Sequence, residues 1–129
     1  RRSSDLLQAP ARAEYSKEDK TMLTNDDKTI LYELYTEYRH RRSAGMSREK
    51  SCDFKSCESI HDNFFPDIPI DDVDFSLRAL SRNGYVKCFY GSNEILECHL
   101  TNNAVAYMES LPKETFLTVI EFVSKFIPW

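Results

Sequence analysis

Glycine and proline are scarce in this chain, with three glycines and five prolines among 129 residues. This scarcity excludes collagen-like and low-complexity chains and argues against a glycine-rich loop that cradles phosphate. Long apolar runs are lacking as well. The most apolar stretch, residues 116–127, is too short to span a bilayer and contains Glu121 and Lys125. No basic segment followed by an apolar one opens the chain, as a secretory signal would, and we expect a cytoplasmic protein.

A strong excess of one charge is also absent. Twenty-one acidic residues against 17 basic ones give a net charge of −4, which excludes a uniformly basic protein that coats nucleic acid. Hydrophobic residues make up 41% and charged residues 29%, the balance of an ordinary globular domain. The length allows one domain with a single core.

Sequence motifs for catalysis and metal binding are not found. No G-x-S-x-G, H-E-x-x-H or Gly-rich loop followed by lysine occurs. Cys52, Cys57, Cys88, Cys98 and His61 could supply zinc ligands in principle, but they lack the paired short spacings of zinc knuckles. Cys57 and His61, four residues apart, could pair as nucleophile and base, but no orienting third residue accompanies them. We expect reduced thiols, no metal or cofactor, and no enzymatic activity.

Hydrophobic periodicity predicts three helices after a polar, flexible arm at residues 1–22. The first begins at a capping box formed by Thr24 and Asp27 and ends near Arg42, before Gly45. Residues 46–55 have weak periodicity and are expected to be irregular. A short second helix over residues 56–65 should bury three apolar side chains: Ile60, Phe64 and Phe65.

The third predicted helix has Asp71 or Asp72 as its N-cap and ends at Asn83-Gly84. Its inner face should consist of Val73, Phe75, Leu77 and Leu80.

A period of two then predicts a β-hairpin with strands at residues 85–90 and 95–100. If Cys88 lies opposite Cys98, one face becomes largely apolar, so we expect this register. It places Val86 opposite Leu100 and Tyr90 opposite Leu96, and leaves Ser92, Asn93 and Glu94 as a three-residue loop.

Two helices are predicted after the hairpin. Thr101 should cap the first, which carries Ala104, Val105, Met108 and Leu111 on its inner face. The second should run from Pro112 to about Ile127, forming an amphipathic C-terminal element at residues 112–129 beside a main domain at residues 23–111. Its apolar side chains cover more than half of its circumference, so we expect a homodimer, with packing inside the monomer as the alternative. The expected dimer contacts are Phe116, Ile120, Val123 and Ile127.

Two motifs flank the hairpin: Leu77-x-x-Leu80-x-x-x-Gly84-Tyr85-Val86 before it, and Leu100-Thr101-x-x-Ala104-x-x-Tyr107-Met108 after it. With the order of elements, they resemble the winged helix-turn-helix family over residues 24–111, although Ala104 stands where glycine is common. The chain is also similar to the small bacterial YjcQ-type winged-helix proteins. The resemblance implies an α+β, mostly helical fold: three helices, a β-hairpin wing and two C-terminal helices.

Winged-helix proteins usually bind duplex DNA with the third helix in the major groove and the wing along the backbone. The resemblance therefore implies a small transcriptional regulator that binds DNA. Residues 39–55 hold six basic and two acidic side chains, a local charge of +4 suited to phosphate. Candidate DNA contacts from this segment, the third helix and the hairpin are Arg39, Arg41, Arg42, Lys50, Arg78, Arg82 and Lys87.

The charge of the neighbouring segment argues for a different partner. Residues 58–74 hold six acidic side chains and no lysine or arginine, a local charge of −6 that phosphate would repel. The alternative is a winged-helix protein–protein interaction module that does not bind DNA. In that case the acidic face at Asp71, Asp72 and Asp74 would bind a basic protein.

Overall fold

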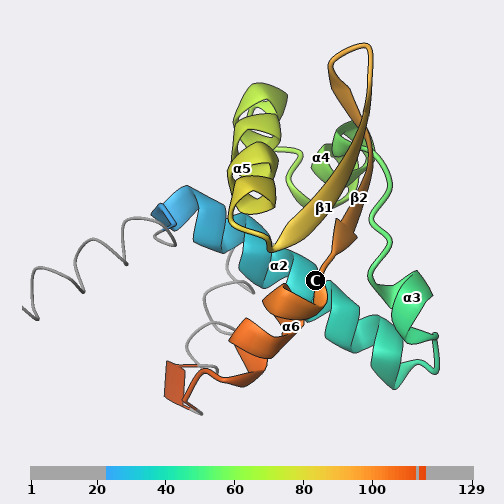
Figure 1. Ribbon diagram of the computed structural model, residues 1–129, viewed down its shortest axis with the longest axis vertical. Helices are drawn as coiled ribbons and strands as arrows, with labels where there is room; N and C mark the ends of the chain where they lie inside the picture. Colours follow the sequence, from blue (N-terminus) through green and yellow to red (C-terminus); the bar gives the residue numbers. More distant parts are fainter. Residues whose placement is uncertain (1–22, 113, 116–129) are drawn as a thin grey trace, which may run out of the picture.

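The longest helix, α2 (Asn25–Ser43), begins at the predicted capping box. Thr24 Oγ1 accepts a hydrogen bond from the Asp27 amide at 3.1 Å, and the Asp27 carboxylate accepts one from the Thr24 amide at 3.4 Å. Leu31 and Leu34 are fully buried, because α2 crosses the middle of the molecule with α5 on one side and α6 on the other (Figure 1). The computed structural model describes residues 23–112 and 114–115. The predicted N-terminal arm and the four predicted dimer contacts lie outside them.

Residues 46–55, expected to be irregular, contain the short helix α3 (Arg48–Ser51). Ser47 caps it by accepting a hydrogen bond from the Lys50 amide at 3.3 Å. Four residues are too few for an apolar period to show in the sequence. After α3 the chain runs antiparallel to the second strand of the hairpin: the Phe54 amide donates to the Cys98 carbonyl and the Leu100 amide to the Cys52 carbonyl, both at 2.9 Å.

The second predicted helix is confirmed as α4 (Cys57–Phe64), capped by Ser56. Ile60 and Phe65 are buried and Phe64 is half-buried.

Helix α5 (Ile70–Arg82) differs from the prediction at its start and on its face. Neither Asp71 nor Asp72 is the N-cap. Pro69 occupies that position, and its carbonyl accepts hydrogen bonds from the amides of Asp72 and Val73, at 2.9 and 3.2 Å. Both aspartates instead lie in the first turn, where carboxylates favour the helix dipole.

Phe75 does not belong to the inner face of α5. Val73, Leu77 and Leu80 are buried as predicted, but 67% of Phe75 is exposed. Each residue advances about 100° around a helix, so Phe75, two residues from both Val73 and Leu77, must point away from them. This correction matters for function, because it places a large apolar side chain in solvent.

Strands β1 (Val86–Gly91) and β2 (Glu94–Leu100) form the antiparallel hairpin, in the predicted register over four pairs, from Val86 opposite Leu100 to Phe89 opposite Glu97. The register then shifts, so that Tyr90 lies opposite Ile95 and not Leu96.

The turn explains this shift. It contains two residues and not three, Ser92 and Asn93, with φ angles of 53° and 66°, as in the tight hairpin turns that match strand twist. The extra residue is taken up as a bulge at Leu96. As a result Ile95 is buried and 53% of Leu96 is exposed, although the expected register places Leu96 on the apolar face.

Thr101 caps α6 (Asn102–Glu109) as predicted, accepting from the Ala104 amide at 3.2 Å. Ala104, Val105 and Met108 are buried against the common core. The described part of the chain is therefore α+β and mostly helical, with a two-stranded antiparallel hairpin after helices.

Gly84 joins α5 to β1 with a φ of +83°, and its carbonyl accepts a hydrogen bond of 2.6 Å from the Thr101 hydroxyl. We expect Gly84→Ala to lower the free energy of unfolding by about 1 kcal/mol, because side chains other than glycine are strained at this φ. A Cβ there would make only an ordinary contact, 3.6 Å from the Asn103 side chain. Gly45→Ala, at φ +94° in open space, should cost the same in urea unfolding if strain is the cause. An unchanged midpoint for both variants would refute this account.

Candidate functional site

Arg41, predicted to contact phosphate, lies against the protein itself. Its Nε pairs with the Glu37 carboxylate at 2.9 Å, and its Nη1 donates to the Asp53 carbonyl at 2.8 Å and the Ser51 carbonyl at 3.4 Å. The guanidinium also stacks 4.6 Å from the centre of the Phe54 ring. These contacts join the end of α2 to the segment after α3, so Arg41 has a structural role.

Arg78 is engaged in the same way. Its Nε pairs with Asp74 at 2.8 Å, its Nη2 donates to the Asn93 carbonyl at 2.7 Å, and its guanidinium lies 5.1 Å from the Tyr90 ring centre. The hydrogen bond to Asp74 raises the pKa of Arg78 above its usual value. Arg78 thus connects the middle of α5 to the tip of the hairpin.

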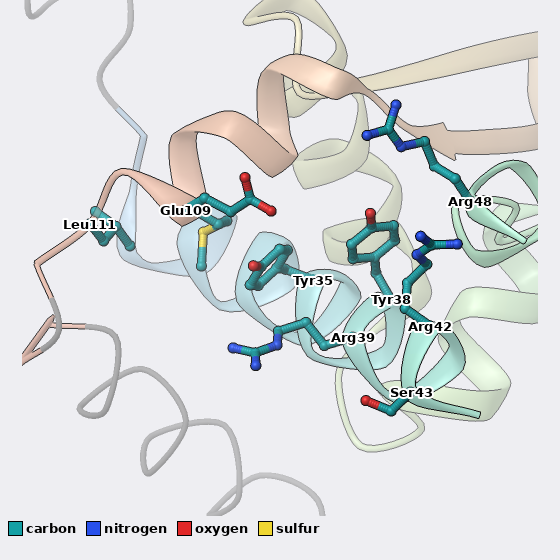
Figure 2. A pocket seen from close by; sticks show the side chains of 9 residues that line it. Tyr35, Tyr38, Arg39, Arg42, Ser43, Arg48, Glu109 and Leu111 are labelled. Carbon is teal, nitrogen blue, oxygen red and sulfur yellow. The ribbon is translucent and has the colours of Figure 1, made fainter. Parts of the chain in front are cut away.

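A pocket of about 750 Å³, which we call the basic pocket, lies between the end of α2 and α6, and its wall includes Arg39, Arg42 and Arg48. Figure 2 shows the Arg42 and Arg48 guanidinium groups near the Tyr38 hydroxyl, with Arg39 directed elsewhere along the wall. Arg48 was not among the predicted DNA contacts, although it belongs to the basic segment. Glu109 lies on the same wall, which reduces the positive charge of the pocket.

The remaining predicted DNA contacts are exposed but dispersed. Lys50 lies on α3, Arg82 at the end of α5, and Lys87 on β1, where its Nζ is 5.5 Å from the Phe89 ring centre. In Figure 1 α5 lies on the other side of α2 from α6, so the basic pocket and the exposed face of α5 are not brought together. The seven predicted residues therefore do not form one surface.

A second hollow, of about 660 Å³, opens between α4, the start of α5 and the hairpin tip. The hollow is acidic, because its wall includes one arginine, Arg78, and four carboxylates: Glu58, Asp71, Asp74 and Glu94. Ile70 and Leu96, both exposed apolar side chains, form part of its wall.

Phe75 and Tyr90 extend this apolar area. Phe75 lies one helical turn before Arg78, and Tyr90 contacts the Arg78 guanidinium. Both rings are substantially exposed. We call the combined area the α5–hairpin surface, consisting of Ile70, Phe75, Tyr90 and Leu96 with the carboxylates Glu58, Asp71, Asp72, Asp74 and Glu94.

The structure also bears on the reactivity of the cysteines, on metal binding and on membrane insertion. Burial raises the pKa of Cys57 to about 11 and disfavours a nucleophilic thiolate there. No group of metal-binding side chains occurs among the described residues. Within the same part of the chain, no helix combines the length and the apolar character needed to cross a membrane.

Comparison with known proteins adds no further constraint. No protein-family model, curated protein or solved structure matches this chain.

Proposed function

We propose that this chain is a winged-helix protein-interaction module whose α5–hairpin surface binds a basic partner segment with apolar anchor residues. The order of α2, α4, α5 and the hairpin supports the winged-helix assignment. One observation carries the function: the outward face of α5, which would enter a DNA groove, presents Phe75 beside Asp71 and Asp72. Carboxylates in that position repel phosphate and attract lysine or arginine.

Two kinds of side chain on this surface, apolar and acidic, would contribute to binding in different ways. Aromatic side chains are among the residues that contribute most to binding when an interface removes them from water. Carboxylates around them steer a basic partner and select against acidic ones. The Arg78 guanidinium is already paired with the Asp74 carboxylate and the Asn93 carbonyl. It therefore does not compensate the charge of the other carboxylates on this surface.

Duplex DNA binding by a regulatory dimer is the second candidate, and the basic pocket favours it. Arg39, Arg42 and Arg48 could position a phosphate backbone there. Each neutralised phosphate contributes roughly 0.9 to the salt dependence of binding. Such binding would fall steeply with salt and would read little sequence, since it uses no base-contacting helix.

Two fluorescent probes separate these functions: an amphipathic peptide with lysine on one face and leucine on the other, and a random-sequence DNA duplex. We expect the peptide to bind and the duplex not to bind at about 50 mM salt. Phe75→Ala should weaken peptide binding at least about tenfold, because the bound peptide would cover the Phe75 ring and make it an aromatic anchor of the interface. Phe89→Ala is the matched control, because Phe89 is exposed on the opposite face of the hairpin from Cys88.

Charge variants complete the test. Replacing Asp71 and Asp72 together with lysine should abolish peptide binding and lower the free energy of unfolding by only about 1–2 kcal/mol, because both side chains are exposed but lie in the first turn of α5. If the duplex binds and the peptide does not, and if Arg42→Ala and Arg48→Ala weaken duplex binding, the regulator function replaces the proposed one.

A further inference from the structure

Cys88 and Cys98 lie directly opposite each other on β1 and β2, and both are free thiols. Their Sγ atoms are 4.0 Å apart and form a weak hydrogen bond. Cys98 is fully buried, whereas Cys88 is half-buried. Side chains of opposed residues project from the same face of a hairpin, so the two sulfur atoms need only a small approach to form a bond.

The surroundings give the two thiols different acidities. A hydrogen bond from Cys98 lowers the pKa of Cys88 to about 7 against the effect of burial, and hydrogen bonds from Tyr90 and Ser81 assist it. The charge of Arg78 acts in the same direction. The pKa of Cys98 is raised, first by its hydrogen bond to Cys88 and then by burial. Near neutral pH about half of the molecules therefore hold a thiolate at Cys88, the more accessible sulfur, while Cys98 stays a thiol.

We propose that Cys88 and Cys98 form a redox-active pair, in which peroxide oxidises Cys88 and Cys98 then closes a disulfide across the hairpin. This proposal does not depend on the proposed function, since the reaction needs neither a protein partner nor DNA. The division of roles follows from access and acidity: a peroxide-reactive cysteine needs an accessible thiolate, and its partner needs to lie beside it.

Both steps can be written with hydrogen peroxide as the oxidant. The Cys88 thiolate attacks one peroxide oxygen, the O–O bond breaks, and the departing hydroxide takes up a proton to become water. Cys88 is now a sulfenic acid. The Cys98 sulfur then loses its proton and attacks the Cys88 sulfur. An S–S bond forms, and the hydroxide released takes up that proton to give a second water. Two thiols and one peroxide thus yield a disulfide and two waters.

Cys57 is the competing thiol nearby, since its charge acts on Cys98 and the charge of Cys88 acts on Cys57. Two features of Cys57 exclude it as the cysteine that reacts first with peroxide. It is buried, and its pKa of about 11 leaves almost no thiolate at neutral pH. Allowing for the greater intrinsic reactivity of a more basic thiolate, Cys88 should react about a hundredfold faster than Cys57 at pH 7.

The experiment uses the reduced full chain, with alkylation by iodoacetamide followed by peptide mapping. Cys88 should be modified first, with a rate that rises through a midpoint near pH 7. In Cys98→Ser this midpoint should remain within about one unit, because a serine hydroxyl can still donate to the thiolate, whereas Cys98→Ala should raise it.

Treatment with one equivalent of peroxide tests the disulfide. The wild type should lose two hydrogen atoms, and the map should show a bond between Cys88 and Cys98. Cys98→Ser should stop at the sulfenic acid, which dimedone traps, and the Cys52→Ser, Cys57→Ser double variant should behave like the wild type. A wild-type chain that stays reduced, or a bond that joins any other pair, overturns the proposal. Because the wild-type map decides the outcome, a variant that fails to fold does not affect the test.

Discussion

Arg41→Ala should lower the free energy of unfolding by about 2–3 kcal/mol, which is the range for losing a hydrogen-bonded, partly buried charge. The alanine would leave the carbonyls of Ser51 and Asp53 without their side-chain donor and would remove the guanidinium stacked on Phe54. Urea unfolding monitored by circular dichroism gives the measurement.

The matched control is Arg42→Ala, one residue further along α2. Among residues 23–112, Arg42 makes a single exposed hydrogen bond of 3.1 Å, to the Met46 carbonyl, so its loss should cost less than about 1 kcal/mol. Arg41→Lys should recover only part of the stability, because an ammonium group cannot reach two carbonyls and a carboxylate with the planar geometry of guanidinium. Equal stabilities for Arg41→Ala and Arg42→Ala would contradict the structural role of Arg41.

Glu33→Gln should raise the free energy of unfolding by about 3 kcal/mol at pH 7. Glu33 is 2% exposed in the middle of α2, and its Oε1 has no hydrogen-bond partner within the described part of the chain. Burial raises its pKa from 4.5 to about 8, and repulsion from Glu37 adds to this effect. Glutamine keeps the shape of the side chain and cannot ionise.

The sign of the pH dependence follows from these two pKa values. In the folded protein Glu33 stays protonated up to about pH 8, whereas in the unfolded chain it ionises above about pH 4.5. The wild type is therefore fully stable with respect to this group below pH 4.5 and loses stability as the pH rises toward 8, by about 1.4 kcal/mol per pH unit. Unfolding curves of both proteins between pH 4 and 8 should converge at the acidic end.

Glu94→Gln serves as the control for Glu33→Gln, because Glu94 is exposed at the hairpin tip. It should leave the difference between pH 4 and pH 8 unchanged. A Glu33→Gln variant that is less stable than the wild type at pH 7 would mean that the carboxyl group makes a favourable interaction in the folded state.

Local patterns in the sequence were sufficient for much of the fold. The Thr24–Asp27 capping box, the Val73, Leu77 and Leu80 stripe and the Cys88–Cys98 register each depend on residues close in sequence or on strict alternation. The bulge could not be located in this way. Ile95 and Leu96 are both apolar, so the choice of which one is buried depends on the backbone of the turn.

The candidate site was less predictable for a different physical reason. A count of charges treats every arginine as available, but Arg41 and Arg78 donate to the carbonyls of Asp53 and Asn93, which are distant in sequence. Only the tertiary structure brings these acceptors within reach. Phe75, by contrast, could have been placed in solvent from helical geometry, since it lies two residues from both Val73 and Leu77.

The antiparallel segment at residues 52–54 has a consequence for how this protein resists aggregation. An uncovered strand offers its free amides and carbonyls to other chains, which can add to the sheet without limit. Cys52 and Phe54 occupy these groups at Leu100 and Cys98, so another chain cannot pair with that end of β2. On the other side β1 has no further strand partner among residues 23–112, but the exposed charge of Lys87 lies on it and the bulge opposite distorts its tip. A charged side chain and a local distortion of the strand both oppose the pairing of β1 with a strand of another molecule.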